Sequence, residues 1–290
     1  MIDTTGTRYR FESTAENLWV LRDWQPFFDK AGLRKTGDFW ALSGDRVDRN
    51  RRSEVHRVTL GHPGQRFYLK RHTDYTARSW RHWFAATPMI LLEMEHLVDY
   101  ARIGFDALEP AAWGWRLENG ASRAFVLMHE LVAYRPLDVL LAAGGHAAAP
   151  ASRGLQAVIR STAAMLARMH RAGFAHRDLY SWHVFVRASA NGFACQPIDL
   201  ERSLTRRALP GFLWWRRRRQ AGDLAALHLT IPLRHAGPGR RMRFFLDYLD
   251  REKLDADAKA FLRTVLAEAR RKGRKNKFKP FGVGDLLNRR

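Results

Sequence analysis

Cysteine is almost missing from this chain: Cys195 is the one thiol in 290 residues. A single thiol excludes an intrachain disulfide framework and cysteine-rich zinc sites, and it is typical of the reducing cytosol. No run of about 18 apolar residues occurs, so we expect no membrane-spanning helix. The first residues, MIDTTGTRYRFE, lack the apolar segment of a secretory signal. These absences predict a cytoplasmic protein and exclude disulfide-rich secreted and integral-membrane classes.

Acidic residues are scarce relative to basic ones. There are 29 Asp and Glu residues against 50 Lys and Arg residues, which gives a net charge of +21. This charge predicts attraction to nucleic acid, anionic lipid or phosphorylated glycans, although a solvated basic surface without a specific partner is the plainer alternative. Part of it is clustered in residues 214–219 (WWRRRR) and 270–279 (RRKGRKNKFK). Indoles beside guanidiniums are typical of a peripheral membrane contact, and a nucleic-acid groove has the same ingredients.

The first part of the chain is rich in strand patterns. Residues 11–31 can form either a helix or an opening strand, whereas residues 38–71 have a β-rich composition. Within them we expect a strand over residues 53–60, a turn at residues 62–65 and a short alternating strand over residues 66–70. Alternation in this last strand places Phe67 and Leu69 on one face, and Tyr68 and Lys70 on the other.

Helical spacing appears next. Apolar residues recur every three or four positions over residues 88–102, which predicts a helix ended by Gly104. The apolar run over residues 124–128 has the length of a strand. A second amphipathic helix is expected over residues 155–169, and from Gly222 onward the pattern is mostly helical.

The remaining strand pattern is a small hairpin. Residues 184–186 and 196–198 form two short apolar runs around the turn dipeptide Asn191-Gly192. The length of the chain fits two domains or one two-lobed domain. We therefore expect an α+β protein with a β-rich first lobe over residues 1–130 and a mainly helical second lobe over residues 131–290.

The segment His176-Arg177-Asp178-Leu179 follows the second amphipathic helix and precedes the first strand of the hairpin. In this context it resembles the H-R-D-L catalytic loop of the protein-kinase fold. Phosphoryl transfer needs a carboxylate that orients the attacking hydroxyl and accepts its proton, and Asp178 is the candidate. Asp199, just after the hairpin, is the candidate ligand for Mg²⁺, a hard cation. The plainer alternative for both residues is an ordinary turn or helix-capping aspartate.

A kinase also needs a cation that holds the phosphates. Lys70, at the end of its strand, matches the kinase lysine, although a solvent-facing strand lysine is the alternative. Its expected partner is Glu93, with Glu95 as the rival. The two glutamates lie roughly 200° apart around a helix, so only one can face the lysine. Asp223 is a candidate for bracing the catalytic loop from a later helix.

Several departures from protein kinases are visible. His183 occupies the position of the Asn that binds magnesium, Tyr180 replaces the lysine two residues after the catalytic Asp, and Glu201 replaces the glycine of D-F-G. No G-x-G-x-x-G precedes the lysine, where the chain instead carries a group of arginines (Arg46, Arg49, Arg51, Arg52). Only 24 positions separate Asp199 from Asp223, and A-P-E is missing. These departures argue against a regulated protein kinase.

The string H-R-D-x-Y-x-x-H over residues 176–183, with I-D-L and a basic stretch after it, is similar to bacterial lipopolysaccharide core kinases. These enzymes phosphorylate heptose or 3-deoxy-D-manno-octulosonic acid (Kdo). The resemblance covers residues 38–230. The spacing from Glu93 to Gly104, followed by Phe105-Asp106, also resembles that family and favours Glu93 over Glu95.

The resemblance implies an ATP- and Mg²⁺-dependent kinase of a sugar hydroxyl in the lipopolysaccharide inner core. It implies that adenine meets the backbone at His129 and Leu131, and that His183 joins Asp199 near the phosphates and the metal ion. The acceptor would be an anionic glycolipid reached by peripheral contact with the cytoplasmic face of the inner membrane, with no specific nucleic acid expected. The alternatives are an atypical protein or small-molecule kinase, and a basic pseudokinase or nucleic-acid-binding module.

Overall fold

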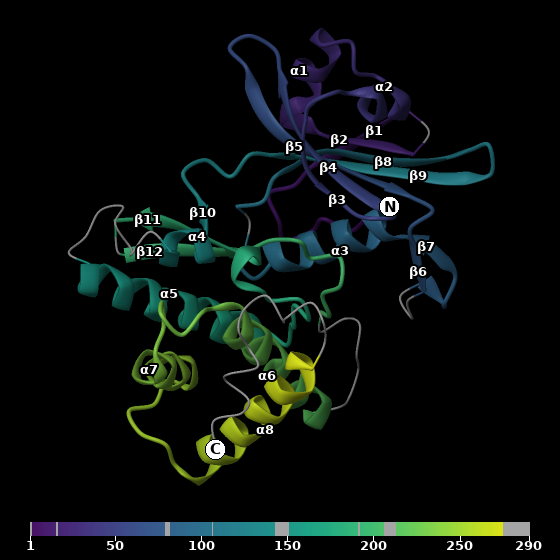
Figure 1. The fold of residues 1–290 in the computed structure, drawn as a ribbon. Helices are drawn as coiled ribbons and strands as arrows, with labels where there is room; N and C mark the ends of the chain where they lie inside the picture. The colour runs from purple at the N-terminus through teal and green to yellow at the C-terminus, as the bar shows by residue number, and fades with distance from the viewer. Residues whose placement is uncertain are drawn as a thin grey trace. The chain divides into compact units, whose positions relative to one another are not determined.

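The computed structural model describes residues 2–15, 17–78, 82–105, 107–142, 151–190, 192–205 and 213–274. The chain separates into two compact units, Met1–Val132 and Ala133–Arg290 (Figure 1). Each unit has its own secondary structure and core, and each is described by itself.

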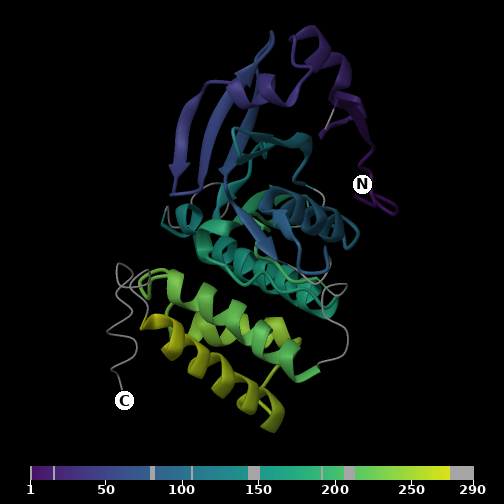
Figure 2. The same ribbon diagram turned by 90° about the vertical axis from the view of Figure 1, so that its right-hand side faces the viewer.

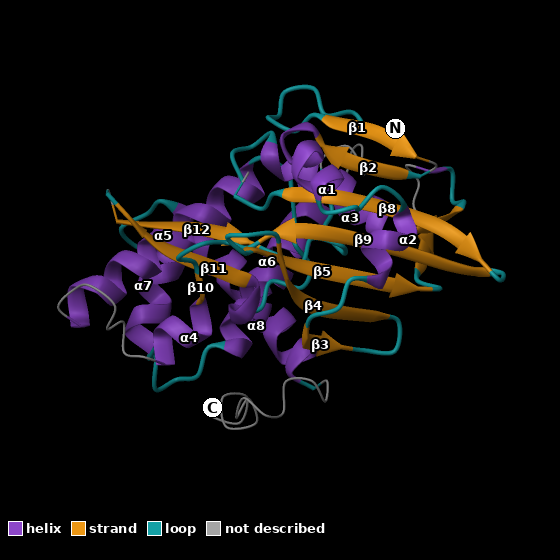
Figure 3. Ribbon diagram, turned by 90° about the horizontal axis from the view of Figure 1, so that it is seen from above, coloured by secondary structure: helices purple, strands orange, loops and turns teal. Residues whose placement is uncertain are grey.

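A seven-stranded sheet forms the first unit, in the order β1-β2-β8-β9-β5-β4-β3 (Figure 3). All neighbouring strands pair in antiparallel fashion. The strands are β1 (Phe11–Ala15), β2 (Leu18–Leu21), β3 (Asp45–Arg49), β4 (Ser53–Leu60), β5 (Gln65–Thr73), β8 (Pro110–Glu118) and β9 (Ala121–His129). A separate two-stranded pair consists of β6 (Thr76–Arg78) and β7 (Ala86–Pro88).

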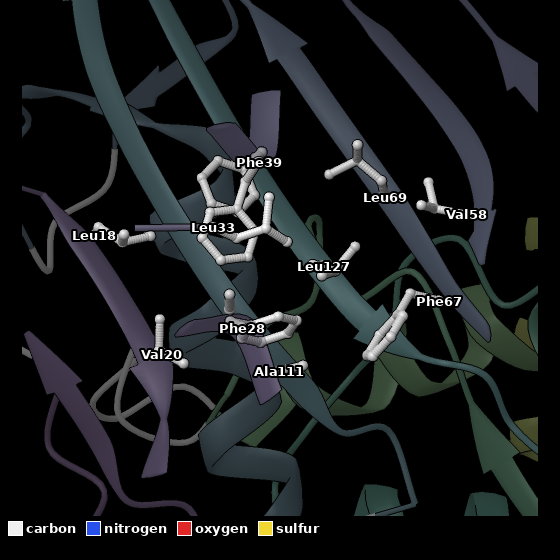
Figure 4. Packing of buried hydrophobic residues seen from close by; sticks show 12 residues of the cluster. Leu18, Val20, Phe28, Leu33, Phe39, Val58, Phe67, Leu69, Ala111 and Leu127 are labelled. Atoms are coloured by element: carbon white, nitrogen blue, oxygen red, sulfur yellow. The ribbon is translucent and has the colours of Figure 1, made fainter. Parts of the chain in front are cut away.

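One face of this sheet is covered by two short helices, α1 (Gln25–Lys30) and α2 (Thr36–Ala41). Phe28 and Phe39 are fully buried there, in one cluster with Phe67 and Leu69 of β5 (Figure 4). The expected shared face of Phe67 and Leu69 is thereby confirmed. Burial of each of these large apolar side chains stabilises this layer by about 1.5–3 kcal/mol.

The opposite face carries α3 (Met89–Ala101). Ile90 and Met94 pack there against Trp113, Ala124 and Val126. Because successive side chains of a strand point to opposite faces, β9 serves both layers with alternate residues. The helix expected over residues 88–102 is confirmed, and the chain leaves it through Gly104, whose φ of +81° suits glycine.

Other expectations for this unit need correction. Residues 11–31 form both kinds of element, since β1 and β2 precede a 3-10 turn (Arg22–Trp24) and α1. Residues 38–41 are helical rather than β, because Phe39 is held in the core by stacking on Phe125. Strand β8 has no clear sequence signal: its Pro, Ala and Gly residues are poor strand formers, and pairing with β2 and β9 makes it a strand.

The second unit is mainly helical. Its helices are α4 (Leu137–Ala142), α5 (Ala151–Arg171), a 3-10 turn (Ser181–His183), α6 (Leu213–Thr230), α7 (Pro238–Leu249) and α8 (Ala256–Gly273). A three-stranded sheet joins β10 (Arg135–Pro136), β11 (Val184–Ser189) and β12 (Gly192–Pro197). Strand β12 packs on α5, and α6 packs on α8, the yellow helix of Figure 2.

The sequence expectations for this unit are mostly confirmed. The β11–β12 hairpin and the amphipathic α5 are present, although Ile198 lies one residue beyond β12 and Asn191 lies outside the described residues. Helix α6 begins at Leu213, nine residues before the expected start. Across the described ranges, no helix is long and apolar enough to span a membrane.

Candidate active site

Lys70 and Glu93 form a buried ion pair inside the first unit. The Nζ atom of Lys70 lies 3.1 Å from Oε1 and 3.0 Å from Oε2 of Glu93. The two side chains are only 11% and 3% exposed. Lys70 pairs with Val126 across β5 and β9, and Val126 packs on the α3 face, so strand alternation directs Lys70 toward α3.

The rival glutamate lies elsewhere. Glu95 Oε1 lies 2.9 Å from Nε2 of His82, as expected for a residue on another side of α3. The structure therefore pairs Lys70 with Glu93, as the spacing to Gly104 favours. The buried carboxylate holds the ammonium group at a fixed place on a rigid strand.

Of the two residues expected at the adenine, His129 is the last residue of β9 and Leu131 lies two positions after it, and both are partly buried. The backbone N–H of His129 already donates to the carbonyl of Glu109 at 2.8 Å. Its ring packs against Trp24 and Phe67. The side chain of His129 thus belongs to the core, and the expected nucleotide contact would have to come from backbone groups in this segment.

The catalytic-loop candidate is braced by Asp223, which is fully buried on α6. Its carboxylate accepts the backbone N–H groups of His176 and Arg177, both at 2.7 Å. It also lies 3.2 Å from Nε2 of His170. These bonds hold Arg177 at a φ of +72°, a conformation that is unfavourable for a residue with a side chain. The bracing role suggested for Asp223 is confirmed.

Both carboxylate oxygens of Asp178 accept hydrogen bonds. The Tyr180 hydroxyl donates to Oδ1 at 2.6 Å, and Nη1 of Arg202 donates to Oδ2 at 2.8 Å. Burial, and then the hydrogen bond to Asp178, raise the pKa of Tyr180 well above its usual value. The phenol therefore stays a neutral donor at physiological pH, and the base candidate is held in one orientation.

His183 and Asp199 bring two lone-pair donors together. Nδ1 of His183 lies 2.8 Å from the carbonyl of Asp178 and must carry the proton in that bond. Nε2 then faces Oδ2 of Asp199 at 3.6 Å with its lone pair. Burial is the main reason that the pKa of His183 is lowered, which favours the neutral ring. The lone pairs of this nitrogen and this oxygen repel each other unless a cation or a proton lies between them. The two side chains therefore fit a metal ion.

Arg202 is the residue of this site that sequence reasoning missed. It follows Asp199 by three positions and contacts a carboxylate 24 positions earlier. The missing lysine at Tyr180 is the one signal that could have prompted a search for a replacement cation. Nothing in the local sequence singles out Arg202 among the many arginines.

The basic cluster at residues 214–219 has a structural part. Arg217 forms an ion pair with Asp257 at 2.7 Å, and Arg218 forms one with Glu268 at 3.0 Å, which link α6 to α8. The side chains of Trp214 and Trp215 lie outside the described part of the chain, as do Asp106 and the residues after 274. This partial neutralisation weakens the expectation of a membrane contact at the four arginines.

Comparison with known proteins decides which protein family the chain belongs to. Residues 37–264 match the model of the lipopolysaccharide kinase (Kdo/WaaP) family. The chain belongs to this family. The matched range contains every candidate residue named above, from Lys70 to Asp223.

A similar protein and a similar solved structure support the same family assignment. The chain is 32% identical to the lipopolysaccharide core heptose(I) kinase WaaP of Pseudomonas aeruginosa over 192 residues, which cover 63% of this chain and 67% of that protein. A solved structure, WaaP in complex with acyl carrier protein, is similar with a TM-score of 0.58 and 26% identity, over 86% of this chain and 95% of that one. This lipopolysaccharide kinase therefore has a protein-kinase-like fold and is a phosphotransferase that acts on a sugar, Kdo or heptose, of the lipopolysaccharide core.

Proposed function

We propose that this lipopolysaccharide kinase transfers the γ-phosphoryl group of ATP to a heptose hydroxyl of the inner core, with Asp178 as the general base. The observation that carries the proposal is the braced loop: Asp223 holds the backbone before Asp178, and Tyr180 and Arg202 donate to the Asp178 carboxylate. Heptose is favoured over Kdo because the curated relative is named a heptose(I) kinase.

The expected reaction is a single displacement. The sugar oxygen forms a bond to the γ-phosphorus while the bond from phosphorus to the β,γ-bridging oxygen breaks, and its electron pair leaves with ADP. Asp178 takes the hydroxyl proton. In the first lobe, Lys70 is positioned by Glu93 and binds phosphate oxygens. The segment of the same lobe at His129 and Leu131 would receive the adenine.

The metal site is assigned to the second lobe. Asp199 supplies a carboxylate oxygen and His183 a neutral ring nitrogen, and a bound Mg²⁺ neutralises phosphate charge. Magnesium prefers oxygen ligands, so the imidazole makes this site softer than one with Asn.

Label transfer from γ-labelled Mg-ATP tests the proposal. The acceptors are heptose-containing core lipopolysaccharide, Kdo-containing lipid A and a generic protein. We expect label on the heptose acceptor alone, and at least a 10²-fold loss for Asp178→Asn, since general-base catalysis contributes about 10²–10⁴-fold. Label on Kdo lipid A would change the sugar, label on protein would indicate an atypical protein kinase, and an active Asp178→Asn would remove the assigned base.

We also propose peripheral contact with the cytoplasmic face of the inner membrane, where the anionic glycolipid acceptor would be reached. The net charge of +21 supports this placement.

A second partner is suggested by a cavity in the second unit. Its volume is about 310 Å³, and it is lined by apolar side chains of α4 to α8, with Arg240 and Arg241 among the lining residues. The related structure contains acyl carrier protein, so we propose that the cavity takes the acyl chain of such a carrier.

Filling the cavity tests this partner. Ile159→Trp places a large ring in the cavity, whereas Val139→Trp on the same unit alters a side chain that is 51% exposed. After co-expression with acyl carrier protein, mass spectrometry should find the acylated carrier on the wild type and on Val139→Trp but not on Ile159→Trp. Equal retention by all three proteins would exclude the cavity as the acyl site.

A further inference from the structure

The catalytic loop lacks a cation of its own at the usual place. Protein kinases carry a lysine two residues after the catalytic Asp, and here that position is Tyr180. Its hydroxyl donates to Asp178 and remains neutral. A neutral phenol can orient the carboxylate, but it cannot balance the charge on a phosphoryl group that approaches the acceptor hydroxyl.

Arg202 supplies a positive charge at this point. Its Nη1 donates to Asp178 Oδ2 at 2.8 Å, and the side chain is 46% exposed. Among the residues that the structure describes, no acceptor contacts its remaining N–H groups. Arg177 donates to the carbonyl of Arg202 at 3.5 Å, a weak contact within the same braced loop.

We propose that Arg202 is a catalytic residue that contacts the phosphoryl group during its transfer, in addition to its hydrogen bond to Asp178. The proposal rests on Asp178 being the general base. A guanidinium is a planar fork of five donors, so it can bind the carboxylate on one side and phosphoryl oxygens on another.

The geometry of the reaction places the phosphoryl group within reach. An acceptor hydroxyl that gives its proton to Asp178 lies about 3 Å from the carboxylate, and the phosphorus lies about 3–3.5 Å beyond it. A guanidinium already bound to that carboxylate is one hydrogen bond away from the equatorial oxygens. Cations at this position act mainly on the transition state, as arginine fingers of other phosphotransferases do.

The experiment compares Arg202→Met and Arg202→Lys with a matched control. Arg243→Met removes an arginine with similar exposure and a similar ion pair. Arg243 is 49% exposed and lies 2.8 Å from a carboxylate oxygen of Asp247 on α7. We expect kcat to fall about 10²–10³-fold in Arg202→Met, with the acceptor KM changed less than about twofold. Arg202→Lys should recover part of kcat, and Arg243→Met should keep it.

Chemical rescue separates a catalytic charge from a structural contact. Because Arg202 is half exposed, its truncation leaves an accessible space beside Asp178. Added guanidinium ion should raise the kcat of Arg202→Met at least tenfold at concentrations that leave wild type and Arg243→Met unchanged. Sodium chloride at the same ionic strength should have no such effect.

Three results would overturn the inference. A raised acceptor KM with unchanged kcat would make Arg202 a binding residue for an anionic group of the acceptor. A raised kcat would make it a brake on the base. A lost kcat without rescue by guanidinium or by lysine would make its role structural. If Asp178→Asn is active, the proposed base fails independently of any result at Arg202.

Discussion

At the residue scale, the proposed chemistry depends on charged side chains whose hydrogen-bond partners are fixed. Lys70 and Glu93 are buried together, and Asp178 is held by Tyr180 and Arg202. A buried ion pair gives little net stability, because desolvation offsets the attraction between the charges. The pair in the first unit is therefore better explained by placement of the ammonium group than by a gain in folding free energy.

A double substitution separates these two roles. Lys70→Met removes one partner of a buried ion pair, so we expect a loss of about 3–5 kcal/mol in unfolding free energy together with a loss of activity. Lys70→Met combined with Glu93→Leu should recover most of the stability and none of the activity. Chemical denaturation and phosphoryl transfer measure the two effects. An active double variant would show that the pair is structural only, and Glu95→Gln serves as the control on the same helix.

The residue His183 predicts an unusual metal preference. An imidazole ligand suits a softer ion such as Co²⁺ better than Mg²⁺, whereas the amide oxygen of Asn suits Mg²⁺. His183→Asn should therefore lower the ratio of Co²⁺-supported to Mg²⁺-supported activity several-fold. The ratio is measured from initial rates with each ion at saturating ATP. An unchanged ratio would remove His183 from the ligand set.

At the element scale, the end of α6 is stabilised by a side chain rather than by a glycine. Arg241 of α7 donates to the carbonyls of Ala236 at 2.7 Å and His228 at 2.7 Å, and to that of Ile231. Burial lowers its pKa to about 10, so it is still charged at neutral pH. A cation at the carbonyl end of a helix interacts favourably with the helix dipole.

This arrangement makes the α6–α7 junction sensitive to acid. Burial, and then Arg241, lower the pKa of His228 to about 4 from 6.5. Between these two pH values His228 binds a proton in the unfolded chain but not in the folded protein. The contribution of His228 to the unfolding free energy is therefore fully present above pH 6.5 and is lost as the pH drops toward 4. His228→Asn retains an acceptor for Arg241 and does not titrate.

Denaturant titrations at pH 7 and pH 4.5 measure this effect. Between these two values we expect the wild type to lose about 2 kcal/mol more unfolding free energy than His228→Asn. Equal losses in the two proteins would show that His228 is already protonated in the folded state or stays neutral in both states.

At the scale of the whole molecule, we expect the excess of basic side chains to govern encounter with an anionic acceptor. The charge of +21 is what remains after every acidic residue has been subtracted, including those in ion pairs such as Arg217 with Asp257. Screening shortens the range of this attraction from ~10 Å at 0.1 M salt to ~3 Å at 1 M. The charge thus acts on association rather than on the fold.

Salt should accordingly weaken acceptor capture more than catalysis. Between 0.1 M and 1 M salt we expect the KM for core lipopolysaccharide to rise at least tenfold while kcat changes less than about twofold. Co-sedimentation with phosphatidylglycerol vesicles should fall in parallel, with phosphatidylcholine vesicles as the control. Binding that is insensitive to salt would contradict an electrostatic contact.

Much of the fold and of the site follows from local patterns in the sequence. Strands 53–60 and 66–70, helix 88–102 and the hairpin before Asp199 each have a signal within about ten residues. Alternation and helical spacing reflect only the two faces of one element. They can therefore be recognised in the sequence without knowing which elements pack against it. The H-R-D-L string is likewise continuous, which is why the fold and the base candidate could be predicted.

The tertiary structure decided the contacts between distant segments. The rotation of α3 on the sheet pairs Lys70 with Glu93 and not with Glu95. Residues 110–118 form a strand because they pair with a strand on each side. The fold also brings Arg202 into contact with Asp178. Composition cannot specify such contacts, because each depends on how packed elements are oriented and not on the residues nearby in the chain. With 50 basic residues available, only the folded chain determines which arginine meets the Asp178 carboxylate and which ones, such as Arg217, join helices.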